Sequence, residues 1–264
     1  MAEFETLKLS VDDFGVATLM LNRPDKHNAM SAQMLADLTH AAGLLGRDDT
    51  VRVVVLTGSG KTFCAGGDLG WMRAQQDTDR ETRKAEARKL ANALAVLDAL
   101  PKPLIGKVQG NAFGGGVGLA CVCDVTFGVE TAKLGLTETR LGLIPATIGP
   151  YVVGRMGLGA ARQVFMSARV FGAAEAARLG ILAAALPAQD LEAAVEREVA
   201  AYLTCAPGAV AAAKSLARSL GSSVDADTIE RSIEALADQW DSAEAAAGIS
   251  AFFDKTPAPW ITER

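Results

Sequence analysis

The stretch GSGKTFCAGGD, residues 58–68, decides the fold of this chain. It follows VRVVVLT, residues 51–57, a β-branched run that predicts a buried strand. The letters GKT match the end of a P-loop, but that motif needs an earlier glycine where this chain has Val55, inside the strand. A P-loop also leads directly into a helix, which Gly66 and Gly67 disfavour. The stretch therefore predicts a strand and a glycine loop that lets the backbone approach a ligand closely.

The same order of strand, glycine-rich loop and helix occurs again along the chain. A second strand is predicted at 104–109, and the glycine-rich GNAFGGGVG leads from it into an apolar helix at 117–123. A third strand at 125–129 precedes a segment rich in Gly and Pro at 134–150. The units share an order but no repeated sequence, so they predict an α/β fold rather than a repeat array.

Caps, breakers and periodicity predict the remaining elements. Two strands form a hairpin, at 5–10 and 16–21. Ser31 caps a helix that Gly46 ends, and a charged helix follows at 79–100. After about residue 155 the chain is expected to be mostly helical, with a helical appendage from about residue 205.

Length and charge narrow the class of protein. The chain of 264 residues is long enough for one large domain, alone or with an appendage. Its net charge of -5 gives the whole molecule no attraction to nucleic acid or to an anionic membrane. The N-terminus lacks an apolar signal segment, and no apolar run reaches the length of a membrane span. A cytoplasmic protein without nucleic-acid or membrane partners is expected.

The cysteines and histidines offer few sites. Four cysteines without paired spacing favour small buried side chains over a zinc site or a disulfide framework, so no metal site is predicted. A hydrolase using Cys64 with His27 is an alternative, although no third orienting residue suggests itself. The other histidine, His40, falls on the exposed side of a predicted helix.

The two glycine loops can present backbone N–H groups to a negative charge. Gly67 lies in a tight loop, and Gly114, Gly115 and Gly116 stand at a helix N-terminus, where free amides and the helix dipole favour anions. Two amides that converge on one oxygen form an oxyanion hole, worth roughly 3 kcal/mol per donor in a transition state. The alternative is that these glycines only make turns.

Five segments together resemble the crotonase, or enoyl-CoA hydratase/isomerase, superfamily over essentially the whole chain. They are LNRPDKHNAM (21–30), FCAGGDL (63–69), VQGNAFGGGVGLACVCD (108–124), AKLGLTETRLGLIP (132–145) and SAFFDKTPAPW (250–260). The resemblance implies a crotonase-like spiral of ββα units over residues 1–204 and a helical trimerisation region over 205–264. It also implies a homotrimer or homohexamer, with an acyl-CoA thioester as substrate and no cofactor apart from the substrate's own coenzyme A.

The resemblance also assigns binding roles. The amides of Gly67 and Gly115 would hold the thioester oxygen as an enolate forms. Residues that would border the adenine and pantetheine are Ala65, Gly66, Asp68 and Leu69. Trp71 and Met72 would line the acyl pocket, or pack in the core. Arg23 and Lys26 would meet the coenzyme phosphates, or remain solvated loop charges. Phe252 and Lys255, with Phe253, would reach the coenzyme site of a neighbouring subunit.

The acidic residues depart from the family pattern. Hydratases of this family usually carry one glutamate where this chain has Gly118 and a second where it has Glu138. A third position, acidic in dienoyl-CoA isomerases, is Ala146 here. Apolar neighbours are expected to raise the pKa of Glu138 into a useful range. Gly118 is expected to leave room beside the thioester β-carbon, so that Gly118→Glu would raise activity on crotonyl-CoA.

A single glutamate fits two reactions. One is the hydration of a branched or carboxylated enoyl-CoA, and the other is a Δ3-Δ2 double-bond shift. The segments AGGDLGWM (65–72) and GLIPATIGPYVVGRMG (142–157) resemble methylglutaconyl-CoA and terpenoid-acid hydratases, which favours hydration. A third alternative is a non-catalytic protein on the same scaffold that binds acyl-CoA or associates with RNA.

Overall fold

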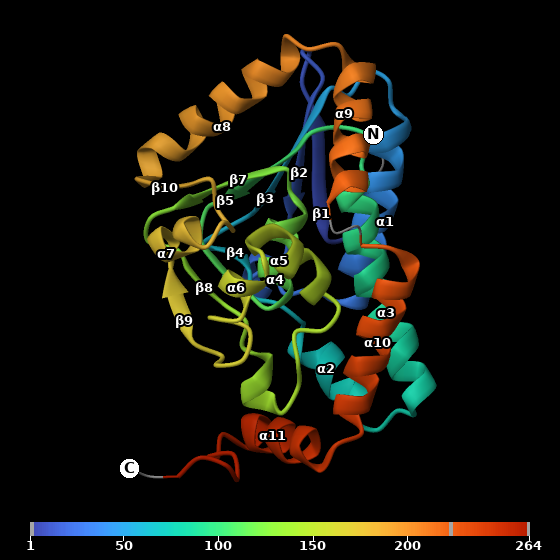
Figure 1. Ribbon diagram of the computed structural model, residues 1–264, viewed down its shortest axis with the longest axis vertical. Helices are drawn as coiled ribbons and strands as arrows, with labels where there is room; N and C mark the ends of the chain where they lie inside the picture. Colours follow the sequence, from blue (N-terminus) through green and yellow to red (C-terminus); the bar gives the residue numbers. More distant parts are fainter. Residues whose placement is uncertain (1–2, 222–223, 263–264) are drawn as a thin grey trace.

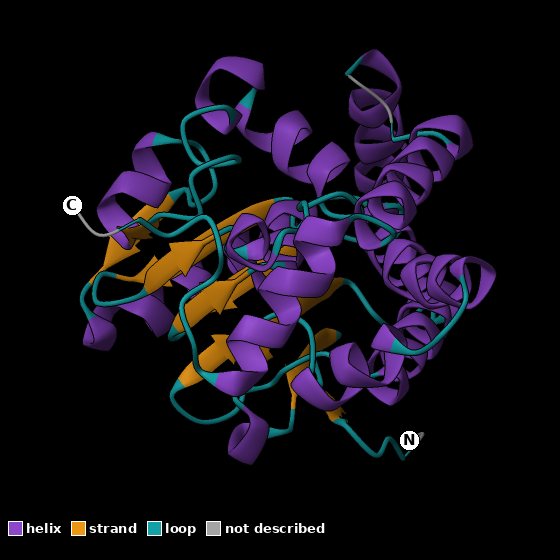
Figure 2. Cartoon of the chain, turned by 90° about the horizontal axis from the view of Figure 1, so that it is seen from below, coloured by secondary structure: helices purple, strands orange, loops and turns teal. Residues whose placement is uncertain are grey.

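The structure is a computed structural model that describes residues 3–221 and 224–262. Two β-sheets organise these residues (Figures 1 and 2). The six-stranded sheet contains, in spatial order, β1 (Leu7–Val11), β2 (Val16–Leu21), β3 (Val53–Gly58), β5 (Leu104–Val108), β7 (Val125–Val129) and β10 (Ala184–Leu186). The four-stranded sheet contains β4 (Thr62–Cys64), β6 (Asn111–Phe113), β8 (Lys133–Gly135) and β9 (Val170–Gly172).

Successive units wind through both sheets in the same order. In each unit the first strand (β3, β5 or β7) joins the large sheet and the next strand (β4, β6 or β8) joins the small one. Within each sheet these strands are parallel neighbours. A chain that repeats this step advances as a spiral, so the predicted α/β spiral of ββα units is confirmed.

Helices surround the sheets and fill the space between the units. In chain order they are α1 (Ala32–Arg47), α2 (Leu69–Gln76), α3 (Arg80–Asp98), α4 (Gly115–Val122), α5 (Gly149–Met156), α6 (Leu158–Ala161), α7 (Ala173–Arg178), α8 (Ala188–Leu203), α9 (Pro207–Leu220), α10 (Ala226–Trp240) and α11 (Ala243–Asp254), with 3-10 helices η1 (Pro24–Lys26) and η2 (Glu138–Leu141). Figure 1 shows α1, α3, α9 and α10 together on one side and α11 at the end near the C-terminus.

The large sheet is covered on both faces. Val53 and Val55 of β3 pack with Val195 and Val199 of α8, whereas Val54 belongs to the main core on the opposite face. Alternate residues of a strand point to opposite faces, so a strand between two apolar layers must be apolar throughout. This explains the continuous apolar run that identified the strand in the sequence.

Several local predictions can be compared with the structure. The hairpin forms, and Ser31 caps α1 by accepting a hydrogen bond from the N–H of Met34 at 3.3 Å. The predicted helix end at Gly46 is wrong: α1 continues through Arg47, and the N–H of Asp48 still bonds to the carbonyl of Leu44. Gly46 lies against Pro101, so packing holds this last turn in place. After Gly58 the chain enters β4 rather than a helix, which excludes a P-loop.

The C-terminal helices pack on the rest of the chain. Arg80 of α3 pairs with Asp238 of α10 and with Asp241, the residue that follows α10, and Ile233 of α10 packs on Ala87 of α3. The division into a core of residues 1–204 and a trimerisation region of 205–264 stays a prediction. Within the described ranges no single helix has the length and apolarity to cross a bilayer; α8 and α9 reach both only as a pair, bent by 106°.

Candidate active site

Three loops meet at one edge of the small sheet. Strands β4, β6 and β8 are parallel neighbours, so their carboxyl ends lie at the same edge. The segments that follow these ends contain Gly66 and Gly67, then Gly114 and Gly115, and then Glu138. The fold thus brings together the glycine loops and the glutamate that the sequence singled out.

Gly67 offers its N–H to the space between the loops. Met30 and Gly67 form an isolated parallel β-bridge. The N–H of Met30 donates to the carbonyl of Gly66, and the N–H of Asp68 donates to the carbonyl of Met30. In a parallel bridge, the residue between two such bonds points its own N–H and carbonyl the other way. The Gly67 amide therefore turns from Met30 toward the cavity that Gly67 lines. The preceding Gly66 has a φ of 93°, a conformation that favours glycine.

Gly115 offers a second amide. It is the first residue of α4, where the N–H has no acceptor within the helix. A methyl group at Gly115 would overlap the Cε of Met30, so only glycine fits there without movement of that side chain. The loops touch, because a methyl group at Gly66 would lie 3.7 Å from the Cα of Gly114. Two backbone amides are therefore available along one wall.

Glu138 places its carboxyl group beside these amides. A methyl group at Gly114 would lie 2.9 Å from its Oε1 and 3.6 Å from its Cδ. The other oxygen, Oε2, is buried and has no hydrogen-bond partner among the described residues. Burial disfavours the charged form and raises the pKa of Glu138 from 4.5 to about 7. A carboxyl group with such a pKa can both accept and donate a proton near neutral pH.

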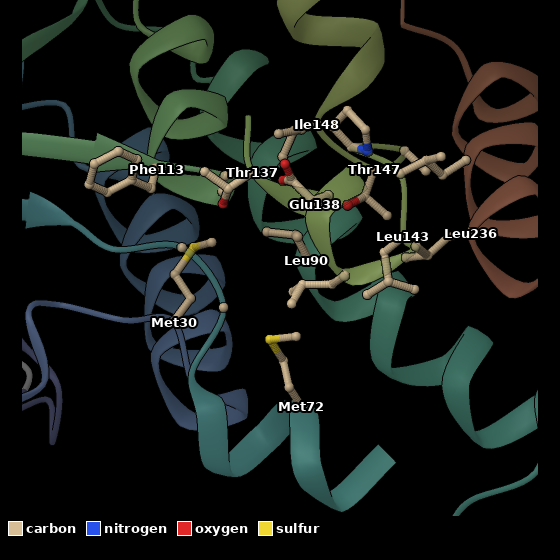
Figure 3. Close-up of a pocket in the computed structure, with 18 of the residues that line it drawn as sticks. Met30, Met72, Leu90, Phe113, Thr137, Glu138, Leu143, Thr147, Ile148 and Leu236 are labelled. Carbon is tan, nitrogen blue, oxygen red and sulfur yellow. The ribbon is translucent and has the colours of Figure 1, made fainter. Parts of the chain in front are cut away.

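A cavity of about 490 Å³ opens in front of Glu138 (Figure 3). Its walls are mostly apolar, and Figure 3 shows Leu143 and Leu236 on one side of Glu138, Phe113 on the opposite side, and Leu90 below Glu138. Of the predicted binding residues, those that line it are Ala65, Gly66, Gly67, Leu69, Trp71, Met72, Gly115, Glu138 and Phe252. The indole N–H of Trp71 bonds to Glu86 at 2.8 Å, which fixes that ring in the wall.

The C-terminal helices of the same chain help to form this site. Leu236 and Trp240 of α10 line the cavity. The backbone of helix α11 packs directly against the backbone of η2, which carries Glu138. A methyl group at Gly248 of α11 would lie 2.6 Å from the carbonyl carbon of Leu141 in η2. Phe252, expected at a neighbouring subunit's site, lines the cavity of its own chain. Within one chain, α11 therefore packs on η2, and the contact of Phe252 with a neighbouring subunit's coenzyme site stays a prediction.

The open space expected beside Gly118 is not there. A methyl group at Gly118 would lie 2.5 Å from Cγ2 of Ile148 and 3.8 Å from Cδ1 of Leu94. Gly118 is buried within α4 and is not among the residues that line the cavity, whereas Ile148 is. The expectation of room for a branched acyl group at Gly118 is therefore wrong, since the side chain of Ile148 fills that place.

The predicted charged residues lie away from the cavity or are engaged elsewhere. Asp68 caps α2 by accepting hydrogen bonds from two backbone amides, and Arg23 pairs with it at 2.9 Å. This ion pair gives Arg23 a structural role in holding the loop before α2. Its contact with the coenzyme phosphates stays a prediction. Lys26 and Lys255 are exposed, and neither lines the cavity. Their coenzyme contacts also stay predictions.

The alternative of a cysteine hydrolase does not fit. Cys64 is buried, and burial raises the pKa of its thiol to about 12, so the thiol stays protonated at neutral pH. The ring Nδ1 of His27 lies 3.2 Å from the hydroxyl of Thr62 instead. In the part of the chain that the structure describes, no three His, Cys, Asp or Glu side chains are grouped to hold a metal ion.

Some lining residues had no direct signal in the sequence. Thr147 and Ile148 lie in the segment before α5, Gln75 at the end of α2, and Met30 just before α1. Each reaches the cavity through the tertiary arrangement of its segment. Three of them had an indirect signal: Met30 is the last letter of LNRPDKHNAM (21–30), and Thr147 and Ile148 lie in GLIPATIGPYVVGRMG (142–157).

The raised pKa of Glu138 predicts a stability that depends on pH. The folded protein holds this proton more tightly than the unfolded chain, so the stability from the protonated form is lost as pH rises from 4.5 through about 7. Above that range the ionised group costs up to about 3 kcal/mol. Glu138→Gln has no such cost, so its free energy of unfolding relative to wild type should increase by that amount from about pH 5 to about pH 8.

Chemical denaturation at both pH values measures this difference. The exposed Glu130 provides a matched control for the substitution, and Glu130→Gln is measured in the same way. A difference between Glu138→Gln and wild type that stays constant with pH would show that Glu138 ionises normally.

Comparisons with known proteins agree with one another. The sequence profile of the family described as enoyl-CoA hydratase/isomerase matches residues 12–263. The chain is 37% identical over 222 residues to the enoyl-CoA hydratase ACTT6 of Alternaria alternata, which covers 83% of this chain and 72% of that protein. Among solved structures, an enoyl-CoA hydratase from Shewanella pealeana matches with a TM-score of 0.80 at 37% identity, covering 98% of this chain and 97% of that one. An enoyl-CoA hydratase from Mycobacterium smegmatis matches with a TM-score of 0.78 at 31% identity, covering 97% and 99%.

Proposed function

The chain belongs to the enoyl-CoA hydratase/isomerase family, and from this premise we propose that it adds water to the double bond of an α,β-unsaturated acyl-CoA thioester. Its relatives are enzymes named for this activity. The observation that carries the proposal is the position of the Glu138 carboxyl group, directly beside the glycine loop at Gly114 and in front of an apolar cavity.

The amides of Gly67 and Gly115 act as the oxyanion hole in this proposal. Attack of water on the β-carbon moves the π electrons onto the thioester oxygen, which becomes an enolate. Neutral amide donors stabilise that charge without acting as acids, at roughly 3 kcal/mol for each donor. The support is the direction of the Gly67 amide and the free first-turn amide of Gly115, both on the cavity wall.

Glu138 transfers the proton. As a carboxylate it takes a proton from water while the water oxygen bonds to the β-carbon. The resulting acid then gives that proton to the α-carbon as the enolate collapses, so the net change is the addition of one water. A pKa of about 7 suits both steps, because neither protonation state is strongly favoured at neutral pH.

The coenzyme end of the substrate would lie along the loop after β4. Ala65, Gly66 and Leu69 line the cavity, which supports the contacts with adenine and pantetheine that the family resemblance implies. The chemistry uses no group beyond the protein and the substrate's own coenzyme A, so we expect no separate cofactor.

The acyl group would occupy the apolar part of the cavity. A branched acyl chain suits walls made of residues such as Leu90, Leu143 and Leu236. A carboxylated acyl group would find one cation among the described lining residues, Arg140 at the exposed rim. A branched or carboxylated substrate is therefore proposed on the basis of these walls, and no longer on the basis of Gly118.

A double-bond shift from Δ3 to Δ2 is the second candidate. It is favoured by one observation: Glu138 is the only carboxylate among the described residues that line the cavity. One base can move a proton from the α-carbon to the γ-carbon without adding water. The same two amides would stabilise the enolate formed on the way.

A panel of acyl-CoA substrates separates the two reactions. We would follow the absorbance of the conjugated enoyl thioester with crotonyl-CoA, 3-methylglutaconyl-CoA and a 3-enoyl-CoA. Hydration removes the absorbance of the first two, whereas isomerisation produces it from the third. Loss of absorbance with a 2-enoyl-CoA supports the proposal, and turnover of the 3-enoyl-CoA alone would contradict it.

We also propose that the enzyme is a homotrimer or homohexamer. The support is a group of large apolar side chains that the single chain leaves exposed, including Leu158, Met166, Leu216, Leu220 and Phe252. Exposed apolar surface of this kind is often covered by a partner. Light scattering at micromolar concentration should give the mass of at least three chains, and an active monomer would contradict the proposal.

A further inference from the structure

Thr147 is a polar residue at the reacting end of the cavity to which no role has been assigned. It lines the cavity and is 5% exposed. The chain holds it in a tight turn, in which the N–H of Ala146 bonds to Ile144 at 2.8 Å and that of Gly149 bonds to Ala146 at 3.0 Å. Figure 3 shows its hydroxyl group directed into the cavity on the side of Glu138. The turn therefore presents this hydroxyl group to the same space as the carboxyl group.

The neighbours of Thr147 indicate which part of the substrate it meets. In Figure 3 it lies between Glu138 and the distal leucines Leu143 and Leu236, whereas Thr137 lies on the opposite side of Glu138, toward Phe113. If the thioester oxygen is bound at the glycine loops, the acyl chain extends past Glu138 toward the distal leucines. The β-carbon then lies closer to Thr147 than the thioester carbonyl does.

The attacking water needs more than one hydrogen-bond partner to be oriented. One of its protons must point to the base, and a lone pair must point to the β-carbon. Oε2 of Glu138 is buried and has no partner among the described residues, so it is available for the first proton. A neutral hydroxyl group can accept the second proton without competing for the one that is transferred. The surrounding Leu90 and Ile148 side chains cannot do so.

We propose that the hydroxyl group of Thr147 positions the water molecule that adds to the β-carbon. The proposal rests on the proposed hydration reaction and deepens it. The water oxygen bonds to the β-carbon, its transferred proton goes to Glu138 and then to the α-carbon, and its other proton remains on the product hydroxyl. Thr147 stays neutral throughout, and it is a positioning residue rather than an acid or a base.

The test compares hydration with a reaction that needs no added water. Exchange of the α-protons of butyryl-CoA with deuterated solvent needs Glu138 and the amides only. Thr147→Val keeps the shape of the side chain and removes the hydroxyl group, so it should lower kcat for hydration by roughly 10²-fold, with KM and α-proton exchange nearly unchanged. Thr147→Ser should retain most of the hydration, and Thr131→Val, at an exposed turn, serves as the matched control.

The outcomes separate this proposal from the function on which it rests. If wild type hydrates enoyl-CoA but Thr147→Val lowers hydration and exchange equally, Thr147 is structural and the proposal fails alone. It also fails alone if Thr147→Val hydrates as fast as wild type. If wild type exchanges α-protons but hydrates no enoyl-CoA, both this proposal and the proposed function are overturned. A selective loss of hydration that Ser restores supports both.

Discussion

Replacement of Glu138 by Gln is expected to lower kcat by about 10²–10⁴-fold while acyl-CoA binding persists. The carboxyl group lies beside Gly114, Glu138 lines the cavity, and Oε2 is buried without a partner in the described residues. Gln keeps the size of the side chain and some of its hydrogen bonding, but it cannot carry a proton between water and carbon. Steady-state kinetics and calorimetric titration with a saturated acyl-CoA separate the two effects.

The control is an exposed glutamate of the same chain. Glu130→Gln, in the turn after β7, should leave both kcat and affinity unchanged. If Glu138→Gln turned over substrate as fast as Glu130→Gln, Glu138 would have no part in the proton transfer, and the group that transfers the proton would have to be sought elsewhere.

Replacement of Gly118 by Glu is expected to destabilise the protein by more than about 3 kcal/mol. Every residue of α4 is buried, and a methyl group at Gly118 would already lie 2.5 Å from Cγ2 of Ile148. The larger side chain adds overpacking to the burial of a carboxyl group next to the apolar Ile148 and Leu94. For a chain of this size the loss corresponds to a fall in Tm of roughly 6–12 °C. The variant should not gain activity on crotonyl-CoA, contrary to the expectation from sequence.

A double-mutant cycle tests whether the contact with Ile148 is the cause. Ile148→Ala alone should destabilise by about 2–5 kcal/mol because it leaves a cavity. In the Gly118→Glu/Ile148→Ala variant the overlap is relieved, so the combined loss should be smaller than the sum of the single losses. Additive losses, or a wild-type Tm for Gly118→Glu, would show that Ile148 does not fill this place.

The parts of the fold that could be predicted are those with a local cause. The β3 strand is apolar because both of its faces are covered, and α1 begins at Ser31 because the side chain bonds to a free amide. The small sheet could not be found in the same way. Its strands β4, β6, β8 and β9 have three residues each, too few for a period to be seen, and they exist through pairing with distant neighbours.

The site divides along the same line. The glycine loops and Glu138 each follow the carboxyl end of a strand. Because these strands are parallel neighbours, their carboxyl ends lie together, so the grouping of these residues could be predicted. The occupant of the space beside Gly118 could not be predicted, because Ile148 reaches it from a segment 30 positions later in the chain. The sequence also did not predict that α10 and α11 help to line the cavity of their own chain. The reason is the same, because the packing of helices distant in sequence leaves no local pattern.

The most direct test of the central claim is the identity of the product formed in isotopically labelled water. Wild type and Glu138→Gln would be incubated with crotonyl-CoA and with 3-methylglutaconyl-CoA in water that carries heavy oxygen, and the products examined by mass spectrometry. Wild type should yield a 3-hydroxyacyl-CoA with one labelled oxygen from at least one of these substrates, and Glu138→Gln should yield almost none. An unlabelled double-bond isomer as the sole product, or equal labelling by the two proteins, would contradict hydration by Glu138.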